Sequence, residues 1–273
     1  MQRMAHASPP APEPGSEPEP GSESESAGPA DGVRSTRLAA RVLVAVTDRA
    51  GGVSAPPYDA RNLGGGAGDD PAAVRQNREK TAAELGVGPG RVVFMRQVHS
   101  ADVRYVTEPF HDVPPALDAV FTDRPGLALA VLVADCAPVL VADPTAGMVG
   151  AAHSGRAGTA AGVVPALVLA MAQRGARPAR MIALIGPCAC GRCYEVPAKL
   201  RHEVASVLPE TWSVTSRETP ALDLRAGITA QLAVAGVRDI RHDARCTIET
   251  PELYSYRRDK RTGRFAGYVW LEA

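Results

Sequence analysis

Aromatic side chains are scarce in this sequence: phenylalanine, tryptophan and tyrosine together make up 4% of its 273 residues. A hydrophobic core must therefore be built mainly from alanine, valine and leucine, since hydrophobic residues of all kinds still make up 45%. Cysteine is also sparse. The five cysteines are an odd number without an even, regularly spaced framework, which argues against a secreted domain held together by disulfides.

An excess of charge of either sign is absent, because 30 basic residues balance 30 acidic ones. This balance argues against a general nucleic-acid binder and against a basic protein of the membrane surface. Long hydrophobic runs are absent too: the longest, residues 127–134, ends at Asp135 and is far too short to cross a bilayer. A charged start followed by an apolar stretch, as in a signal peptide, is missing. We therefore expect a cytoplasmic protein without nucleic-acid or membrane partners.

The first residues differ in composition from the rest. From Ser8 to Ala30 every residue is proline, glutamate, serine, glycine or alanine, and none is basic. Such a segment cannot bury enough apolar surface to offset its chain entropy, so we predict a disordered acidic tail over residues 1–36. Residues 37–273 contain no linker-like stretch and are expected to form one catalytic domain.

The order of apolar and turn-forming segments predicts an α+β fold. Helices are expected over 71–85, 159–174, 198–208 and 223–235, the first with Asp70 as its N-cap. Pro165 in the second implies either a kink or a late start of that helix. Strands are expected over 41–47, 92–98, 119–122, 127–134, 138–142, 148–152 and 181–185. Because strands and helices do not alternate regularly, a mixed sheet is favoured over a doubly wound one.

Polar residues follow several of these strands, and three of them form a plausible metal-ligand set. His99, Cys136 and His153 offer two imidazoles and one thiolate, which suit Zn²⁺ and leave a fourth position open. A zinc ion in such a site lowers the pKa of bound water to about 7. Asp135 precedes Cys136, and if the strand continues there it points away from the metal.

The same side chains allow a second interpretation. Cys136 could act as a thiolate nucleophile with His99 or His153 as its base, and the sequence does not separate this from metal binding. A further cluster, Cys188-Ala-Cys190-Gly-Arg-Cys193, has its nearest additional cysteine at Cys246. We interpret these cysteines as reduced thiols packed around a turn, with a structural metal site as the alternative.

Basic residues gather near the C-terminal part of the sequence, in Ser255-Tyr-Arg-Arg258 with Arg261 and Arg264. Guanidinium groups bind phosphate or carboxylate in a bidentate manner, although a solvated strand edge is the alternative. Gly155 and Gly158 flank an expected helix start, where backbone N–H groups could hold an anion or the glycines could serve a tight turn.

Taken together, the motifs resemble the YfiH-like family, whose members carry the names laccase-domain protein, polyphenol oxidase, peptidoglycan editing factor and purine nucleoside phosphorylase. The resemblance runs from about residue 62 to residue 271. It rests on the ordered succession of Asn62-Leu-Gly64, Gly68-Asp-Asp70, Asn77-Arg78, Gln97-Val-His99, Ala134-Asp-Cys-Ala-Pro-Val-Leu140, Ala152-His153, Ile185-Gly-Pro187, Cys193-Tyr-Glu-Val196, Leu222-Asp-Leu224, Ser255-Tyr-Arg-Arg258 and Thr262-Gly-Arg264.

This resemblance implies a single layered domain and a zinc ion held by His99, Cys136 and His153. It implies purine nucleosides and phosphate as substrates: phosphorolysis of adenosine, inosine, guanosine and methylthioadenosine, together with deamination of adenosine. A copper-dependent phenol oxidase activity is also attached to the family, so copper is a second candidate metal. Homodimers are common among similar proteins. We assign Gln97, Arg156 and Arg257 to the binding of substrate or phosphate.

One segment departs from the family pattern. Where the family usually has H-A-G-W-R-G, this sequence reads His153-Ser-Gly-Arg156-Ala157-Gly. An indole that could stack on a base is replaced by Arg156, and the usual arginine by Ala157. The leading hypothesis is thus a zinc-dependent purine nucleoside enzyme. Its rivals are a cysteine-nucleophile hydrolase or amidase acting on peptidoglycan-related substrates, a copper-dependent polyphenol oxidase, and a metal-stabilised binding module acting through its acidic tail.

Overall fold

The computed structural model describes residues 33–111 and 113–273, so most of the predicted tail lies outside the described residues. The helices are α1 (Pro71–Glu84), α2 (Arg156–Ala161), α3 (Val163–Gln173), α4 (Ala198–Val207), α5 (Leu224–Val234) and α6 (Tyr256–Asp259). The strands are β1 (Thr36–Ala39), β2 (Val42–Val46), β3 (Val92–Val93), β4 (Val103–Tyr105), β5 (Ala119–Thr122), β6 (Ala128–Val133), β7 (Ala137–Asp143), β8 (Met148–Ser154), β9 (Ile182–Ile185), β10 (Trp212–Val214), β11 (Pro220–Leu222), β12 (Asp239–His242) and β13 (Phe265–Leu271).

Two mixed sheets form the centre of the molecule. One has six strands in the order β12-β9-β7-β8-β5-β4, and the other has five in the order β1-β2-β13-β6-β3; β10 and β11 form a separate short hairpin. The pairs β12–β9, β4–β5 and β3–β6 are parallel, and their neighbours are antiparallel. This arrangement confirms the predicted α+β class with mixed sheets flanked by helices.

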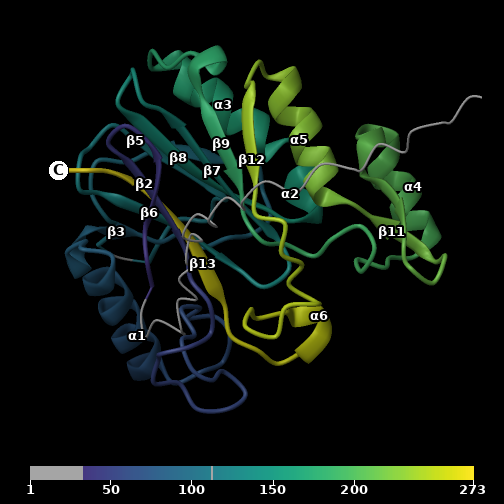
Figure 1. Cartoon of the computed structure of the whole chain (residues 1–273), viewed down its shortest axis with the longest axis horizontal. Coiled ribbons are helices and arrows are strands. Elements are labelled where there is room, and N and C mark those ends of the chain that lie inside the picture. The colour runs from purple at the N-terminus through teal and green to yellow at the C-terminus, as the bar shows by residue number, and fades with distance from the viewer. Residues whose placement is uncertain (1–32, 112) are drawn as a thin grey trace, which may run out of the picture. The chain divides into compact units, whose positions relative to one another are not determined.

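The sheets are stacked and covered by helices on both outer faces (Figure 1). Between the sheets lies an aliphatic core that includes Leu129 of β6 and Leu140 of β7, both fully buried. The outer face of the six-stranded sheet packs against Leu167 of α3 and Ile228 of α5. The outer face of the five-stranded sheet packs against α1 through Ala82. The core is therefore aliphatic, as the scarcity of aromatic residues predicts, and the layers are helix, sheet, sheet, helix.

The helix starting at residue 71 forms as its sequence predicts. The Asp70 side chain accepts a hydrogen bond from the backbone N–H of Ala72 at 2.9 Å, and Pro71 occupies the first turn. The predicted helix over 159–174, in contrast, is wrong in its bounds. The chain forms α2 and α3, separated at Gly162 with φ +82°. There is no kink at Pro165; α3 instead begins late, at Val163, which is the other alternative that Pro165 implied. Pro165 lies in the first turn of α3, where a missing N–H removes no intrahelical hydrogen bond.

The predicted strand over 92–98 is also too long. Only Val92–Val93 pair with β6, and the following residues leave the sheet. The Gln97 side chain replaces the backbone there: its amide donates to the carbonyl of Leu132 at 2.7 Å and accepts the Leu132 N–H at 2.9 Å. Released from regular pairing, the chain turns at His99, whose φ is +63°. This irregular segment positions the first residue of the site.

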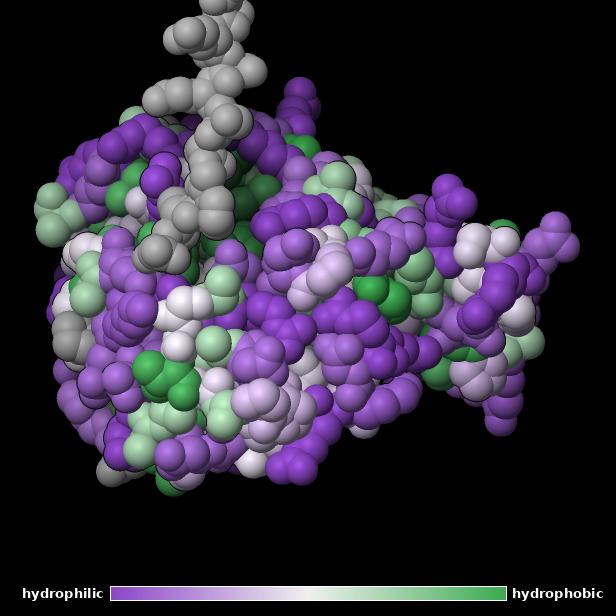
Figure 2. All heavy atoms as spheres, turned by 60° about the horizontal axis from the view of Figure 1, so that its bottom comes forward, coloured by the Kyte–Doolittle hydropathy of each residue, from purple (hydrophilic) through white to green (hydrophobic). Residues whose placement is uncertain are grey.

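The surface is mostly polar on the face shown in Figure 2, where hydrophobic side chains form separate small patches among hydrophilic ones. Among the helices that the structure describes, none combines the length and the apolar character that a bilayer crossing requires.

Candidate metal centre and its cavity

Three chain segments bring His99, Cys136 and His153 together. His99 lies on the loop after β3, Cys136 on the turn between β6 and β7, and His153 near the end of β8. Their donor atoms all lie within 4.8 Å of one another. The Cys136 Sγ is 3.6 Å from Nε2 of His99, and the two imidazole rings are 4.7 Å apart between centroids. Two nitrogens and one sulfur at this spacing fit the donor set of a tetrahedral zinc site with one free position.

Asp118 holds two of these three residues in place, a role that the sequence analysis missed. One carboxylate oxygen of this fully buried residue lies 2.7 Å from Nδ1 of His153, which leaves Nε2 free for a metal. The other oxygen accepts the backbone N–H groups of Val98 and Ser100 at 3.0 and 2.7 Å. A carboxylate behind a histidine ligand fixes the tautomer and orientation of the ring. Here it also fixes the loop on both sides of His99.

Burial and the charges of neighbouring groups shift the pKa values of Asp118, Cys136 and His153. Burial would raise the pKa of Asp118, but hydrogen bonds from His153, Ser100 and Val98 hold it at about 2. Burial would likewise raise the pKa of Cys136, but the charges of His153 and His99 lower it to about 6. Burial opposes the charged form of His153, yet Cys136 and Asp118 raise its pKa to about 9. Cys136 is therefore predisposed to be a thiolate at neutral pH, the form that binds metals and attacks electrophiles.

Asp135, next to Cys136 in sequence, serves the fold rather than the centre. Its carboxylate accepts hydrogen bonds from the hydroxyls of Thr247 and Ser255 and from the backbone N–H of Arg257, at 2.6–2.7 Å. It points away from the metal donors, as expected, but for a different reason. The strand does not continue through it; the chain turns there, with φ +99° at Asp135.

The three donors line a cavity of about 780 Å³ that also contains Arg78, to which the sequence analysis gave no role, and Arg264, one of the basic residues it singled out as possible anion binders. Arg78 comes from α1 and Arg264 from the residue before β13. Burial lowers the pKa of both guanidinium groups. Within residues 33–111 and 113–273, Arg78 donates to the carbonyl of Leu63, and Arg264 donates to two backbone carbonyls, but neither pairs with a carboxylate. The family-like segments Asn77-Arg78 and Thr262-Gly-Arg264 were the signal that could have marked them.

The three predicted binding residues lie at different places. Gln97 lines the cavity, but both ends of its amide bond the backbone of Leu132. Arg257 lines a separate hollow of about 620 Å³, where it donates to the carbonyl of Glu195 and lies over the ring of Tyr194. Arg156 is the first residue of α2 and is half-buried. Their binding roles stay predictions.

The sequence of this chain is similar to those of known proteins. The family model described as multi-copper polyphenol oxidoreductase laccase matches residues 43–272. A purine nucleoside phosphorylase of Streptomyces coelicolor is 59% identical over 227 residues, which cover 83% of this chain and 94% of the relative. A purine nucleoside phosphorylase of Mycobacterium bovis is 49% identical over 232 residues, which cover 85% of this chain and 93% of the relative.

Solved structures show the same fold. The YlmD protein of Geobacillus stearothermophilus superposes with a TM-score of 0.81 at 33% identity, covering 87% of this chain and 94% of that one. A hypothetical protein of Bacillus licheniformis named YfiH gives a TM-score of 0.81 at 29% identity, covering 89% and 98% of the two chains. By sequence and by structure, this chain belongs to the laccase-like YfiH family.

Proposed function

We propose that residues 37–273 form a zinc-dependent enzyme that cleaves purine nucleosides with phosphate. One observation carries the proposal: a histidine-cysteine-histidine donor set and two half-buried arginines without carboxylate partners line the same cavity. The cavity's volume of about 780 Å³ lies within the usual range for small-molecule sites. The names of the relatives, purine nucleoside phosphorylase, support this reaction class.

Arg78 and Arg264 are suited to hold the phosphate. A half-buried guanidinium without a carboxylate loses hydration and gains little in return, so an anionic ligand is a favourable partner for it. Aromatic rings flank both groups: Arg78 lies 4.0 Å over the centroid of Phe94, and Arg264 lies 6.0 Å from that of Tyr256. These contacts restrict the orientation of the guanidinium groups. They therefore present fixed N–H donors to an anion in the cavity.

In the reaction, a phosphate oxygen forms a bond to the ribose C1′ while the bond from C1′ to the purine nitrogen breaks. The electron pair of that bond goes to the purine, which ends with the proton that hydrogen phosphate carried. His99, Cys136 and His153 would hold a zinc ion, which would supply Lewis acidity toward a substrate oxygen. Arg78 and Arg264 orient the phosphate, and Asp118 keeps His153 in the tautomer that presents Nε2.

Deamination of adenosine is the second activity in the hypothesis, and the residues that line the cavity support it less than they support phosphorolysis. Zinc deaminases use a carboxylate beside the metal to move protons. Among the lining residues that the structure describes, none is an aspartate or glutamate. Asp118 is engaged by His153 and two backbone amides, and Asp135 faces the other way. We therefore expect phosphorolysis to be the main activity and conversion of adenosine to inosine to be slower.

The low pKa of Cys136 favours one rival, a thiolate nucleophile with a histidine base. The two reactions differ in their dependence on metal. A nucleophilic cysteine keeps its activity in chelator and is alkylated by iodoacetamide, whereas metal-dependent phosphorolysis is lost in chelator and restored by added zinc. Two imidazoles and a thiolate also suit copper, so restoration by copper is measured alongside restoration by zinc.

The test is an incubation of the purified protein with adenosine, inosine or guanosine and phosphate, with free base and ribose 1-phosphate quantified. Arg78→Met removes the guanidinium group that α1 contributes to the cavity, and we expect a rise in KM for phosphate of at least tenfold. Arg75→Met, on an exposed position of the same helix, serves as the matched control and should behave as the wild type. Metal-loaded protein that releases no free base from any of the three nucleosides would refute the proposal.

A further inference from the structure

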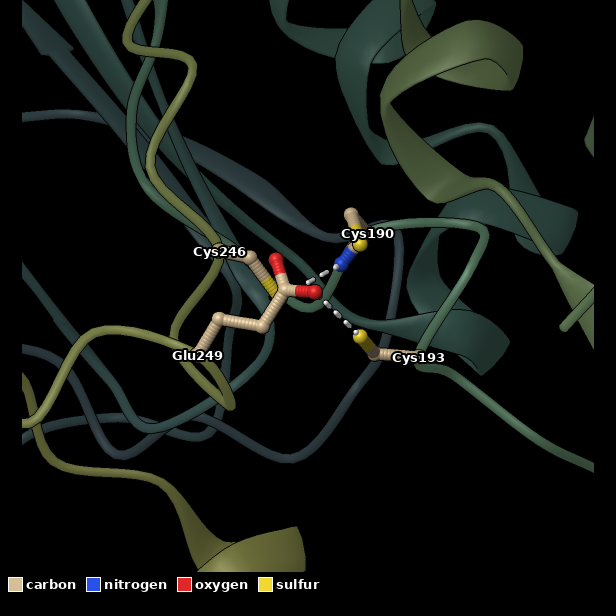
Figure 3. Close-up of side chains that lie close together, drawn as sticks. All are labelled: Cys190, Cys193, Cys246 and Glu249. Atoms are coloured by element: carbon tan, nitrogen blue, oxygen red, sulfur yellow. Dashed lines mark hydrogen bonds between the residues drawn. The ribbon is translucent and has the colours of Figure 1, made fainter. Parts of the chain in front are cut away.

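A second group of metal-binding side chains lies outside the cavity. Cys190, Cys193, Cys246 and Glu249 each offer a donor atom, and these atoms all lie within 4.8 Å of one another. Figure 3 shows the side chains pointing toward one another, two from each of two separate chain segments. None of the cysteines is in a disulfide. The sequence analysis favoured packed reduced thiols here, because Cys246 is remote in sequence and Glu249 gave no signal.

The two segments have the same local construction. Cys190 and Cys193 are three residues apart, and the N–H of Cys193 donates to the carbonyl of Cys190 at 3.0 Å. Cys246 and Glu249 repeat this spacing, with the N–H of Glu249 donating to the carbonyl of Cys246 at 3.1 Å. Paired turns with two donors each, three residues apart, are the usual ligand arrangement of structural zinc sites.

Hydrogen bonds inside the group join its two segments. The backbone N–H of Cys190 points at the Sγ of Cys246 at 3.4 Å, and the Cys193 thiol donates to the Glu249 carboxylate at 3.2 Å. In a tetrahedral zinc–thiolate site, sulfurs 2.3 Å from the metal lie about 3.8 Å from one another. All four donor atoms lie within 4.8 Å of one another, so the sulfurs need to move together by at most about 1 Å to share an ion.

We propose that Cys190, Cys193, Cys246 and Glu249 form a structural zinc site that fastens the loop after β9 to the loop after β12. The two strands are parallel neighbours, so both loops leave the same edge of the sheet. The group closes the coordination sphere with four protein ligands, whereas the cavity centre has three donors and an open position.

The location gives this site a structural purpose. Thr247, next to Cys246, bonds the Asp135 carboxylate beside the cavity centre, and Glu195, two residues after Cys193, accepts from Arg257. An ion at the cysteine group would thus stabilise the segments that contact the turn between β6 and β7, which carries Cys136. It would touch neither the cavity nor the substrate.

The test separates the two metal sites. Full-length protein carrying His99→Ala and His153→Ala loses the cavity centre, so any zinc that survives dialysis reports the cysteine group. We expect one zinc per chain in this background. Cys246→Ser should abolish it. Cys188→Ala, which changes a cysteine outside the group but in the same loop as Cys190 and Cys193, is the matched control and should retain it. Cobalt in place of zinc should give a sulfur-to-metal charge-transfer absorption that Cys246→Ser removes. No zinc in the background variant, or zinc retained after Cys246→Ser, would overturn the proposal.

A second measurement covers the case in which Cys246→Ser does not fold. In the zinc-loaded background variant, Cys190 and Cys193 should resist alkylation by iodoacetamide and become labelled once a chelator is added, as read by peptide mass spectrometry. Equal labelling with and without chelator would contradict a metal site. A disulfide between any two of the three cysteines in freshly purified protein would contradict it as well and would indicate a redox pair instead.

Discussion

At the residue scale, the buried carboxylate of Asp118 positions two candidate metal ligands without being a ligand itself. It contacts His153 directly and His99 only through the neighbouring backbone amides. His153 depends on one of the Asp118 oxygens, and the loop that carries His99 depends on the other. Replacing one oxygen by an NH₂ group must leave either the imidazole or the amides without an acceptor, since the new amide is itself a donor.

Asp118→Asn is therefore expected to weaken metal binding at the cavity centre by 10- to 100-fold, the usual effect of losing a carboxylate behind a histidine ligand. Competition with a chromophoric chelator measures this affinity. Asp102→Asn, at an exposed position of the adjoining loop, is the control. Unchanged zinc affinity in Asp118→Asn would show that the carboxylate does not orient the ligands.

Gly155 is the second residue whose identity the centre requires. A Cβ at this position would lie 2.5 Å from Cδ2 of His99 and 2.7 Å from the Sγ of Cys136. Its φ of −86° suits any residue, so the restriction is purely steric. Gly155→Ala should displace His99 or Cys136 and abolish tight zinc binding with little loss of secondary structure, as read by metal analysis and circular dichroism.

Gly158→Ala, one turn further along α2, gives the comparison. Its added Cβ would meet its neighbours at 3.4 Å or more, and alanine favours a helix over glycine. This variant should bind zinc as the wild type does. If Gly155→Ala and Gly158→Ala bound zinc equally well, the steric argument would be wrong.

The sequence could single out His99, Cys136 and His153, which the fold brings together, because histidine and cysteine at the ends of strands are chemically conspicuous. It did not predict Asp118, because an aspartate before a strand has many ordinary explanations and its partners come from two other segments. Arg264 was noted as one of several basic residues, but its pairing with Arg78 could not be predicted for a similar reason: the two are 186 positions apart, and only the tertiary fold brings them to one cavity. Glu249 became visible only when its turn was seen opposite Cys190 and Cys193.

At the element scale, the turn between β6 and β7 connects the centre to the later part of the chain. This turn carries Cys136 toward the cavity and Asp135 toward Thr247, Ser255 and Arg257. Opposite orientations of adjacent residues are available because Asp135 adopts a positive φ. Folding of the C-terminal segment and positioning of the sulfur are thus coupled through one turn.

Asp135→Ala should destabilise the whole protein, because two hydroxyls and one backbone N–H lose their acceptor in a buried place. Unsatisfied buried donors cost about 1–3 kcal/mol each, so a loss of roughly 2–4 kcal/mol is expected after partial relaxation. Denaturant titration measures it, and Asp102→Ala at an exposed position should cost little. A change in activity without a change in stability would argue that Asp135 acts in the chemistry.

Most helices and strands could be predicted from the sequence, because at those positions local preferences and tertiary packing favour the same structure. The strand over 119–122 and the start of α1 at Pro71 match their predicted bounds. The break at Gly162 was not predicted. Glycine in an apolar run and proline three residues later both signal an interruption of the helix, and only packing decides between them. The strands β4, β10 and β12 are short and partly exposed, so they carry little alternating pattern.

At the scale of the whole molecule, we propose that the folded domain needs nothing before residue 33. The backbone N–H of Val33 bonds the Glu84 carboxylate of α1, and β1 begins at Thr36. A chain starting at residue 33 should match the full chain in Tm and in turnover. A chain starting at residue 41 lacks β1 and the Arg37–Glu272 ion pair, so its Tm should fall. A lower Tm in the first truncation would extend the domain into the acidic segment.

The place of β13 has a consequence for the order of assembly. Residues 265–271 pair with β2 on one side and β6 on the other, so this late segment joins strands made far earlier. Until β13 has been translated, β2 and β6 have no common neighbour, and the edges that they present to each other stay unpaired. Such nascent chains are prone to aggregate and to engage chaperones. Arg264, directly before β13, reaches the cavity only in this last step, so incomplete translation products should lack one of the two arginines that we propose to bind phosphate.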